Sequence, residues 1–322
     1  MIDILIPTYN RAEFLKKNIL MLNRQINERN LGNYYKIIIS DNNSKDNTWD
    51  VIGELKNEVQ VEIEKFRQVE NIGLEPNAVF LLEKSRAEYV MYLGDDDYLP
   101  DGYLEFVVKI IQEENAECVI PGFSELYSDG SIKPARYSDF EIRRYEPGFD
   151  TVCKISNFGH QLSGLVTRRE SLFEEYTKEE KYRNIYPFVF FVTYCMLQGV
   201  TYFVPKYQVL VSQNNSKDWK YDASGLLLDI FRNYKIAFSN DRDKLAEACL
   251  SFARIQSWRL RVSYNPINAF RSFFHLIESK EVDNRIKVAL IWLYLVLYCK
   301  GVIITIKNKF GFLNKSNVKP AL

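Results

Sequence analysis

The chain has 322 residues, of which 47% are hydrophobic, so it can bury a substantial core and is not a disordered protein. Its 42 basic residues balance 42 acidic residues, a composition that favours neither a nucleic-acid-binding protein nor an acidic tail. Five scattered cysteines and only two histidines are unlike a disulfide framework, a zinc site or an imidazole-rich metal centre, and they indicate reduced thiols in the cytosol.

The first part of the chain repeats a strand followed by a helix. Apolar residues at helical spacing predict helices that begin near Ala12, Asp46 and Pro76. Strands are predicted at 2–6, where Pro7 ends the strand, and at 35–40, 59–66 and 88–93. Strands that alternate with helices imply right-handed crossovers and an α/β fold with a mostly parallel sheet flanked by helices on both faces.

The pattern after Pro121 is less regular. Residues 123–138 predict a hairpin or a long loop, residues 159–172 predict a strand that leads into a helix, and residues 186–199 predict a buried helix ended by Gly199. From about Ser216 the chain is predicted to be helical to its end. We therefore place a domain boundary near residue 215.

Polar clusters follow three of the predicted strands. They read "PTYNR" at 7–11, "SDNNSKDNT" at 40–48 and "GDDD" at 94–97. Ligands of open parallel sheets bind beyond the carboxyl ends of the strands, so we expect these clusters to meet along one edge. Taken singly each cluster also fits a simple turn, with Tyr9 as a space-filling side chain and Asp41 in an Asx turn. Their order along the chain favours a binding site.

The triple aspartate has the strongest chemical signal. Asp95, Asp96 and Asp97 repel one another, and in a half-buried loop they take up protons unless a cation neutralises them. Mg²⁺ or Mn²⁺ suits such oxygen ligands, usually with the phosphates of a substrate as further ligands. A solvated acidic turn before a helix near Asp101 is the alternative, and the position directly after a strand favours the metal site.

Four segments resemble the inverting glycosyltransferases of family 2. They are "IPTYNR", "IIISDNNSKDNT", "ENIGLEPN" (70–77) and "YVMYLGDDDYLPDGYLE" (89–105), in the order and at the separations usual for the family, and "SDN" and "GDDD" are similar to its abequosyltransferase-like members. The resemblance covers residues 1–121. It implies a GT-A-type, Rossmann-like fold, a nucleotide-sugar donor and a bound Mn²⁺ or Mg²⁺ ion.

The resemblance also implies roles for single residues. It places Pro7, Tyr9 and Asp41 at the nucleoside, and Asn71, Gly73 and Asn77 in the loop beside it. Asp95, Asp96 and Asp97 are expected to hold the ribose and the metal, with Asp96 as the principal ligand. The family more often has an aspartate at the position of Leu93, so the sharing of roles among the three aspartates stays open.

The general base does not follow from the family pattern. Family members commonly carry a Glu-Asp pair before an apolar helix in the second half, and no carboxylate lies between Tyr182 and Gly199 here. An acceptor hydroxyl that attacks in one inverting step needs a carboxylate or imidazole base. The candidates are His160, Glu179, Glu180 and Asp97, and we favour His160 because it precedes "LSGLVTRR", which is similar to the acceptor-side segment of the family. A structural histidine is the alternative.

The C-terminal segment is apolar and basic. Residues 288–299 read "VALIWLYLVLYC" and are followed by Lys300 and Gly301, so the run is too short and too interrupted to span a bilayer. Eight basic and two acidic residues between Lys280 and Leu322 give this segment a charge of +6. Burial against the preceding domain, an oligomer contact and an interfacial helix are the alternatives. Since the chain starts with a strand and shows no secretion signal, we expect a cytoplasmic protein with peripheral contact to the inner membrane face.

These observations predict a metal-assisted, inverting enzyme that moves a hexosyl or deoxyhexosyl group. The donor is a nucleotide sugar, the acceptor is a glycan or lipid-linked saccharide of a bacterial surface polysaccharide such as capsule or O-antigen, and no nucleic acid is involved. Residues 1–215 are the expected GT-A catalytic domain, with a nucleotide-sugar half (1–121) and an acceptor half (122–215), and residues 216–322 are a helical C-terminal region.

Other functions are less consistent with the sequence. An inactive homologue that only binds nucleotide sugar or glycan is the main alternative, and the missing Glu-Asp pair favours it. A dinucleotide-dependent oxidoreductase or a nucleotidyltransferase requires a glycine-rich first loop, which "PTYNRAEF" does not provide.

Overall fold

The computed structural model describes residues 1–133, 140–213, 225–260 and 266–315, and it describes side chains as far as residue 299. The chain divides into two compact units, Met1–Asp218 and Trp219–Leu322. The boundary predicted near residue 215 lies outside the described residues.

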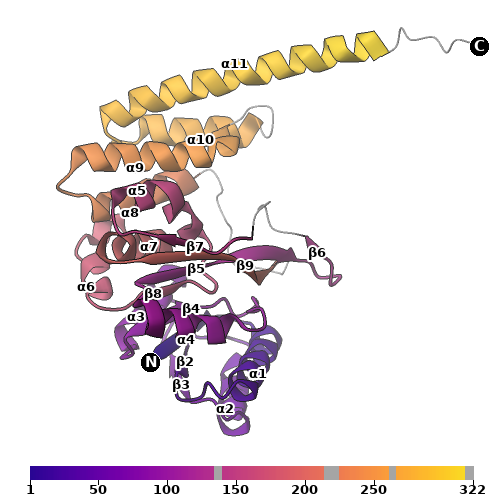
Figure 1. Ribbon diagram of the computed structural model, residues 1–322, viewed down its shortest axis with the longest axis vertical. Coiled ribbons are helices and arrows are strands. Elements are labelled where there is room, and N and C mark those ends of the chain that lie inside the picture. The colour runs from indigo at the N-terminus through magenta and orange to yellow at the C-terminus, as the bar shows by residue number, and fades with distance from the viewer. Residues whose placement is uncertain (134–139, 214–224, 261–265, 316–322) are drawn as a thin grey trace, which may run out of the picture. The chain divides into compact units, whose positions relative to one another are not determined.

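The first half of unit 1 consists of four strand–helix pairs, as predicted (Figure 1). They are β1 (Ile2–Thr8), α1 (Ala12–Glu28), β2 (Tyr35–Asp41), α2 (Thr48–Glu58), β3 (Ile63–Arg67), α3 (Leu74–Lys84), β4 (Tyr89–Tyr92) and α4 (Tyr103–Glu114). Two strand boundaries differ from the prediction by two residues or more. The first strand continues through Pro7, which pairs in register with Ser40. The third strand begins at Ile63 because Val59 still donates its N–H to Leu55, over 3.0 Å, and ends α2.

The second half of unit 1 contains shorter elements. They are β5 (Cys118–Leu126), β6 (Ile132–Lys133), β7 (Arg143–Tyr145), α5 (Phe149–Ile155), the 3₁₀ turn η1 (Ser156–His160), β8 (Val166–Arg168), α6 (Leu172–Thr177), the 3₁₀ turn η2 (Glu180–Tyr182), α7 (Pro187–Gln198) and β9 (Thr201–Ser212). The antiparallel pair of β5 and β6 confirms the start of the predicted hairpin, whose residues 134–138 lie outside the described ones. The predicted buried helix is α7.

The strands form one sheet in the order β3-β2-β1-β4-β8-β5-β9-β7, with β6 paired to β5. Strands β3, β2, β1 and β4 run parallel, so Ile4 lies between Ile37 and Met91. Strand β8 runs antiparallel to β4 and β5, whereas β5 and β9 are parallel. The predicted α/β class with a mostly parallel sheet is confirmed, and the carboxyl ends of β1 to β4 share one edge.

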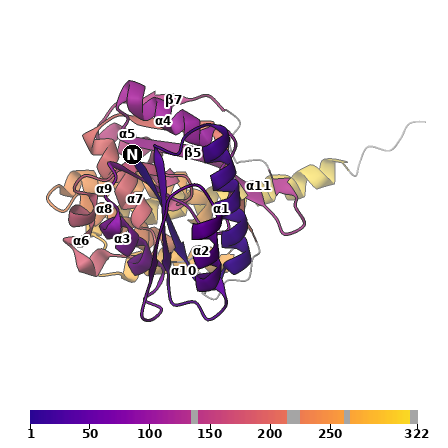
Figure 2. The same cartoon turned by 90° about the horizontal axis from the view of Figure 1, so that it is seen from below.

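Helices cover both faces of this sheet. On one face the helices α1, α2 and α4 pack against alternate residues of β1 and β2, and α1 and α2 lie side by side in Figure 2. On the other face Tyr92 of β4 contacts Phe188 of α7, with ring centroids 4.9 Å apart, and its hydroxyl donates to Ala78 of α3. Burial on both faces explains why the strand residues read as continuous apolar runs.

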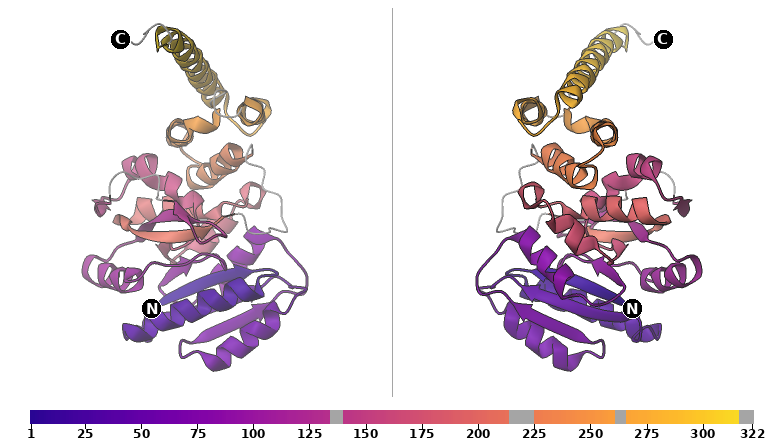
Figure 3. Two further views of the ribbon diagram at one scale, coloured as in Figure 1. Left: turned by 90° about the vertical axis from the view of Figure 1, so that its right-hand side faces the viewer. Right: turned by 90° about the vertical axis from the view of Figure 1, so that its left-hand side faces the viewer.

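Unit 2 is helical, as predicted. It contains α8 (Leu226–Ala237), α9 (Arg242–Ile255), the 3₁₀ turn η3 (Ser257–Leu260), α10 (Pro266–Glu278) and α11 (Asn284–Lys315). Helix α11 lies beside α9 and α10 (Figure 3). It continues through Lys300 and Gly301, since lysine favours a helix and one interior glycine costs only about 1 kcal/mol. None of the helices in the described part of the chain has the length and hydropathy needed to cross a membrane.

Candidate functional site

The loops after β1 and β2 are joined by hydrogen bonds. The backbone N–H of Asn10 donates to the Ser44 hydroxyl over 2.8 Å, and the N–H of Lys45 donates to the Asn10 side chain over 2.8 Å. Asn10 adopts a left-handed backbone conformation with φ of 54°, which asparagine tolerates better than most residues. Pro7 is buried at the end of β1, and Tyr9 beyond it is half-buried. Two of the predicted clusters therefore lie side by side.

Asp41 is fully buried at the end of β2. Its Oδ1 accepts hydrogen bonds from the backbone N–H, over 3.0 Å, and the hydroxyl of Ser44. Its Oδ2 accepts no hydrogen bond and lies 3.3 Å from Nε of Arg67. The guanidinium of Arg67 is held by the carbonyl of Ser44 and the ring of Trp49, at 3.1 Å and 5.6 Å. The sequence reasoning missed Arg67, although the end of β3 lies at the same sheet edge.

Asn42 holds the loop that carries Asn71 and Gly73. Its Nδ2 donates to the Asn71 side chain over 2.9 Å and to the Gly73 carbonyl over 3.1 Å, and its Oδ1 accepts from the N–H of Ile72. Gly73 has φ of 93°, which favours glycine, and it lies directly before α3. The predicted loop residues thus lie next to the Asp41 segment.

Asn77 contacts protein groups rather than open space. It is 1% exposed, its Oδ1 accepts from the Ser40 hydroxyl over 2.6 Å, and its Nδ2 donates to the Ser40 carbonyl over 3.0 Å. These bonds fix α3 to β2. In this structure Asn77 therefore holds the start of α3 to β2 and does not face open space.

The acidic loop after β4 is connected to the first strand. The Thr8 hydroxyl donates to Oδ2 of Asp95 over 2.7 Å, which joins the first and the third cluster. Asp95 and Asp96 are both partly exposed. Burial of its oxygens and, second, the negative charge of Asp96 raise the pKa of Asp95 to about 7. A cation beside these two carboxylates lowers both penalties.

Asp97 points into the protein. It is 5% exposed, its Oδ1 accepts from the backbone N–H of Ser212 over 2.9 Å, and its Oδ2 accepts from the Ser163 hydroxyl. Ser163 also accepts the N–H of Gly94 over 3.0 Å. Asp97 therefore ties the acidic loop to β9 and to the segment before β8, and its two oxygens already have protein donors.

The carboxylates of the acidic loop suit a metal shared with a substrate. Within the described ranges, no group of three or more His, Cys, Asp or Glu side chains comes together to hold a metal ion. Magnesium usually keeps one or two protein carboxylates and takes further ligands from phosphates. Asp95 and Asp96 fit this donor set, and Asp97 fits it less well because of its bonds to Ser163 and Ser212.

Two side chains of helix α1 hold the backbone of the acidic loop and of Leu99 beyond it. Asn18 donates from Nδ2 to the carbonyls of Gly94 and Asp97, over 2.9 Å and 2.8 Å, and Gln25 donates to the Leu99 carbonyl over 2.9 Å. Both side chains are buried on the apolar face of the helix. Two amides seven residues apart on an apolar stripe were a readable signal of this support, which the sequence analysis did not use.

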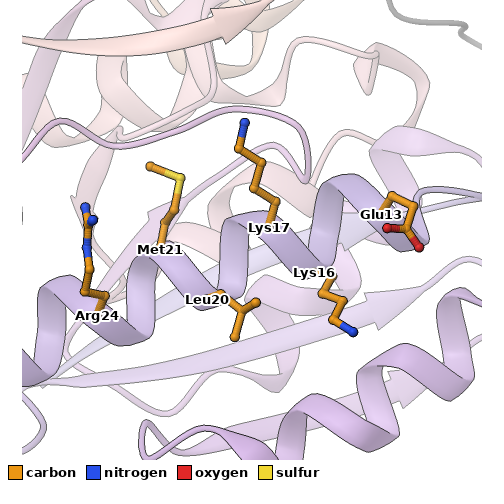
Figure 4. A pocket seen from close by; sticks show the side chains of 6 residues that line it. All are labelled: Glu13, Lys16, Lys17, Leu20, Met21 and Arg24. Atoms are coloured by element: carbon orange, nitrogen blue, oxygen red, sulfur yellow. The ribbon is translucent and has the colours of Figure 1, made fainter.

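An open groove of about 430 Å³ runs along the outer side of α1 (Figure 4). Its lining side chains are Glu13, Lys16, Lys17, Leu20, Met21 and Arg24. Nζ of Lys17 lies 4.6 Å from the ring centre of Tyr98, and Arg24 lies 3.6 Å from Asp101, so the groove adjoins the acidic loop. It contains none of the predicted site residues.

His160 lies at the end of η1, partly exposed. Its Nδ1 is 2.5 Å from the carbonyl oxygen of Asn157, and a carbonyl only accepts, so Nδ1 carries a proton. Phe123 meets the ring edge-on at a centroid distance of 6.3 Å. Three residues later Ser163 contacts the acidic loop. The histidine and the acidic loop thus belong to connected segments.

A charged pair links the two halves of unit 1. Arg183 contacts Glu75 through two bonds, Nε to Oε1 over 2.8 Å and Nη2 to Oε2 over 3.1 Å. Glu75 lies in the first turn of α3, and Arg183 lies between η2 and α7. Glu179, a candidate base, instead pairs with Lys181 at 3.5 Å on the surface. The pair was not predicted, because sequence separation gives no hint of it.

A match to a family model shows the family of this chain. Residues 3–176, more than half of the chain, match the model of the family described as "Glycosyl transferase family 2". The chain belongs to glycosyl transferase family 2. The matched residues include the polar clusters at 7–11, 40–48 and 94–97, on which the predicted resemblance rests.

Two curated relatives match part of this chain. Poly(ribitol-phosphate) beta-N-acetylglucosaminyltransferase TarP of Staphylococcus aureus is 30% identical over 125 residues, which are 37% of this chain and 35% of TarP. Abequosyltransferase RfbV of Salmonella typhimurium is 32% identical over 99 residues, which are 31% of this chain and 29% of RfbV. The chain thus matches about a third of the length of these relatives.

Solved structures show the same fold over most of the chain. The crystal structure of S. aureus TarS 1–349 in complex with UDP-GlcNAc has a TM-score of 0.63 and covers 96% of this chain and 92% of that one, at 15% identity. The complex of the same TarS region with UDP has a TM-score of 0.62. These similarities confirm the GT-A fold that the sequence motifs imply.

Proposed function

We propose that this protein transfers a sugar from a nucleoside diphosphate to a glycan or lipid-linked saccharide during the synthesis of a bacterial surface polysaccharide. The main observation behind the proposal is the hydrogen bond between Thr8 and Asp95 in a family 2 chain. It brings the proposed nucleoside loops (7–11 and 40–48) and the acidic loop (94–97) together at one sheet edge. The names of TarP and RfbV, both glycosyltransferases, support it.

Asp41 and Arg67 favour uridine or thymidine as the nucleoside. Oδ2 of Asp41 is a buried acceptor whose charged contact is Arg67, and Arg67 is 40% exposed. The imide N–H of uracil or thymine can donate to this oxygen when it takes the place of that contact, and the displaced guanidinium can then donate to a ring carbonyl. Cytosine has no such N–H. The binding of UDP-GlcNAc by TarS supports this choice.

The acidic loop is the proposed diphosphate site. A Mg²⁺ or Mn²⁺ ion held by Asp96 and Asp95 would supply Lewis-acid stabilisation of the leaving diphosphate. Thr8 orients the carboxylate of Asp95, and Asn18 fixes the loop backbone through the carbonyls of Gly94 and Asp97. The chain thereby holds two carboxyl groups in place before the donor arrives, which avoids reorganisation during the reaction.

His160 is the proposed general base of an inverting transfer. The bond from Nδ1 to Asn157 sets the tautomer in which Nε2 is the acceptor nitrogen of the unprotonated ring, and Nε2 would take the proton of the attacking hydroxyl. His160→Gln is expected to lower kcat by about 10²-fold to 10⁴-fold, because the glutamine cannot take the proton. Donor binding, measured by titration with UDP, is expected to stay unchanged. Unchanged kcat in a steady-state assay contradicts this role.

A donor panel tests the proposed function. UDP-, dTDP-, CDP- and GDP-sugars are titrated into the full chain with Mn²⁺, and transfer to purified surface saccharides is measured by mass spectrometry. We expect tight binding of uridine or thymidine donors and transfer of the sugar. In Asp41→Asn the preference over CDP-sugars is expected to fall at least about tenfold, because the amide can also donate to cytosine. Donor binding without transfer to any acceptor favours the inactive binding module instead.

The proposed acceptor also implies a place of action. A lipid-linked saccharide is presented at a membrane, so we propose that the protein works in the cytoplasm with peripheral contact to the cytoplasmic face of that membrane. The net charge of +6 between Lys280 and Leu322 supports this contact.

A further inference from the structure

Unit 2 exposes large apolar side chains on two helices. On α10, Ile267, Phe270 and Phe274 are 63%, 44% and 49% exposed. On α11 six further residues are between 38% and 66% exposed, namely Val288, Ile291, Trp292, Leu295, Val296 and Tyr298. We call these nine residues the apolar face. Proteins that stay monomeric in water rarely leave so much connected apolar surface uncovered.

Helix α11 is apolar on two opposite sides. Ile286 and Leu290 are 2% and 0% exposed and form the side that packs within unit 2. At 100° per residue, the exposed positions of the helix fall within an arc of about 160° opposite to them. An ordinary surface helix carries polar residues there. The outer side of α11 therefore requires a cover other than water.

The two helices form one surface. Tyr294 of α11 stacks on Phe273 of α10 at a centroid distance of 4.2 Å and lies 6.2 Å from Phe270. The hydroxyl of Tyr294 is buried without a hydrogen-bond partner in the described part of the chain, so this contact is an apolar one. In Figure 1 the two helices run next to each other. The exposed residues of α10 and α11 thus belong to one rigid pair.

The charges around the apolar face indicate which partner covers it. Residues 284–322 contain seven basic and no acidic residues, and the basic ones are Arg285, Lys287, Lys300, Lys307, Lys309, Lys315 and Lys319. Arg285 pairs with Asp243, and the other six basic residues are lysines. In a symmetric contact between two copies, the same positive segments meet each other. Anionic lipid headgroups neutralise them instead and attract the segment to the membrane.

We propose that the apolar face lies on a membrane surface that contains anionic phospholipids. Helices α10 and α11 run in the plane of the interface, the apolar face enters the boundary between headgroups and acyl chains, and the positive charge of residues 284–322 attracts the headgroups. Trp292 and Tyr298 have the amphipathic rings that favour this depth. This inference specifies the surface behind the membrane contact of the proposed function and rests on that function only for the identity of the membrane.

Vesicle binding of the full chain tests the proposal. Sedimentation with vesicles of phosphatidylcholine, with and without phosphatidylglycerol, is expected to show strong binding only to the anionic vesicles, weakened by salt. Brominated acyl chains are expected to quench the fluorescence of Trp292. The variant Trp292→Phe is expected to keep its binding and to lose most of this quenching, which places the residue in the lipid.

A matched pair of variants separates the apolar face from apolar surface in general. Val288→Ser, Trp292→Ser and Leu295→Ser together are expected to weaken vesicle binding at least about tenfold. Leu20→Ser, Val69→Ser and Ile185→Ser together, three exposed apolar residues of unit 1, are expected to leave it unchanged. Donor binding, measured by titration with UDP, is expected to be the same in both, so a failure of the proposed function is seen separately.

Two results overturn the proposal. One is a wild-type chain that stays in the supernatant with anionic vesicles while UDP binding shows a folded protein. The other is a stable dimer by light scattering that the α11 variant converts to monomer without any change in vesicle binding, since the apolar face then covers a second copy. Equal binding to neutral and anionic vesicles contradicts the role of the lysines.

Discussion

Asp96→Ala is expected to lower turnover by about a hundredfold or more and to leave the melting temperature nearly unchanged. Asp96 is partly exposed on the acidic loop, and its carboxylate is the proposed principal metal ligand. Its removal takes away charge stabilisation at the diphosphate, whose loss typically costs this much. The backbone carbonyl of Asp96, which accepts from the Ser212 hydroxyl, is retained, so the loop keeps that contact.

Asp97→Ala, the neighbouring substitution, is the control and is expected to behave differently. It leaves the buried N–H of Ser212 and the Ser163 hydroxyl without their acceptor, which costs about 2–4 kcal/mol in unfolding free energy. For a domain of this size each kcal/mol lowers the melting temperature by about 2–4 °C. Binding of Mn²⁺ in the presence of UDP, followed by the electron paramagnetic resonance signal of free Mn²⁺, is expected to be lost in Asp96→Ala and kept in folded Asp97→Ala.

The reverse pattern identifies Asp97 as the ligand. If Asp97→Ala melts like the wild type but no longer binds Mn²⁺, the main role of Asp97 is to bind the metal and not to bond with Ser163 and Ser212. If both variants retain Mn²⁺ binding and turnover, the acidic loop is not the diphosphate site, and the proposed mechanism fails.

The strand ends of the first half were predictable because two independent signals agree there. Apolar runs such as 35–40 mark buried strands, and the polar residues that follow, such as Asp41, have no reason to stand at the edge of a core unless they bind something. The parallel order then brings Thr8 and Asp95 together across 87 positions of sequence. Composition alone does not contain this contact, but the alternation of strands and helices does.

The direction of each side chain was not predictable from residue type. "GDDD" shows three equal carboxylates, yet the structure turns Asp97 inward to Ser163 and Ser212, which come from distant segments. Likewise Asn77 satisfies Ser40 of a neighbouring strand. Such partners depend on which loops pack together, and a single sequence carries no periodic signal for loops. The helical character of the last part of the chain was predictable from residue type, and α11 continues through Lys300 and Gly301 as far as Lys315.

Arg183→Ala is expected to lower the unfolding free energy by about 3–5 kcal/mol, which is a large part of the stability of a typical domain. Glu75 has a side chain only 8% exposed and Arg183 one that is 23% exposed, so the substitution leaves a carboxylate with little water and no cation. Chemical unfolding measured by circular dichroism checks this value. Lys181→Ala removes an exposed pair with Glu179 in the same segment and is expected to cost less than about 1 kcal/mol.

The double variant Glu75→Gln with Arg183→Ala separates loss of the pair from loss of packing. Glutamine removes the buried charge, so the double variant is expected to be more stable than Arg183→Ala alone, by an amount that a double-mutant cycle measures. Glu75 follows Gly73 by two residues, so the loop at 70–73 is expected to become more mobile in Arg183→Ala. UDP binding is then expected to be weaker even where the protein is still folded. We infer that this pair couples the loop at 70–73 to the segment before α7. Two results contradict this view. One is an Arg183→Ala variant as stable as the wild type, and the other is a double variant that loses more unfolding free energy than the sum of the losses in the two single variants. In that case the two halves of the domain are held by apolar contacts such as Tyr92 with Phe188, and the pair contributes little to stability.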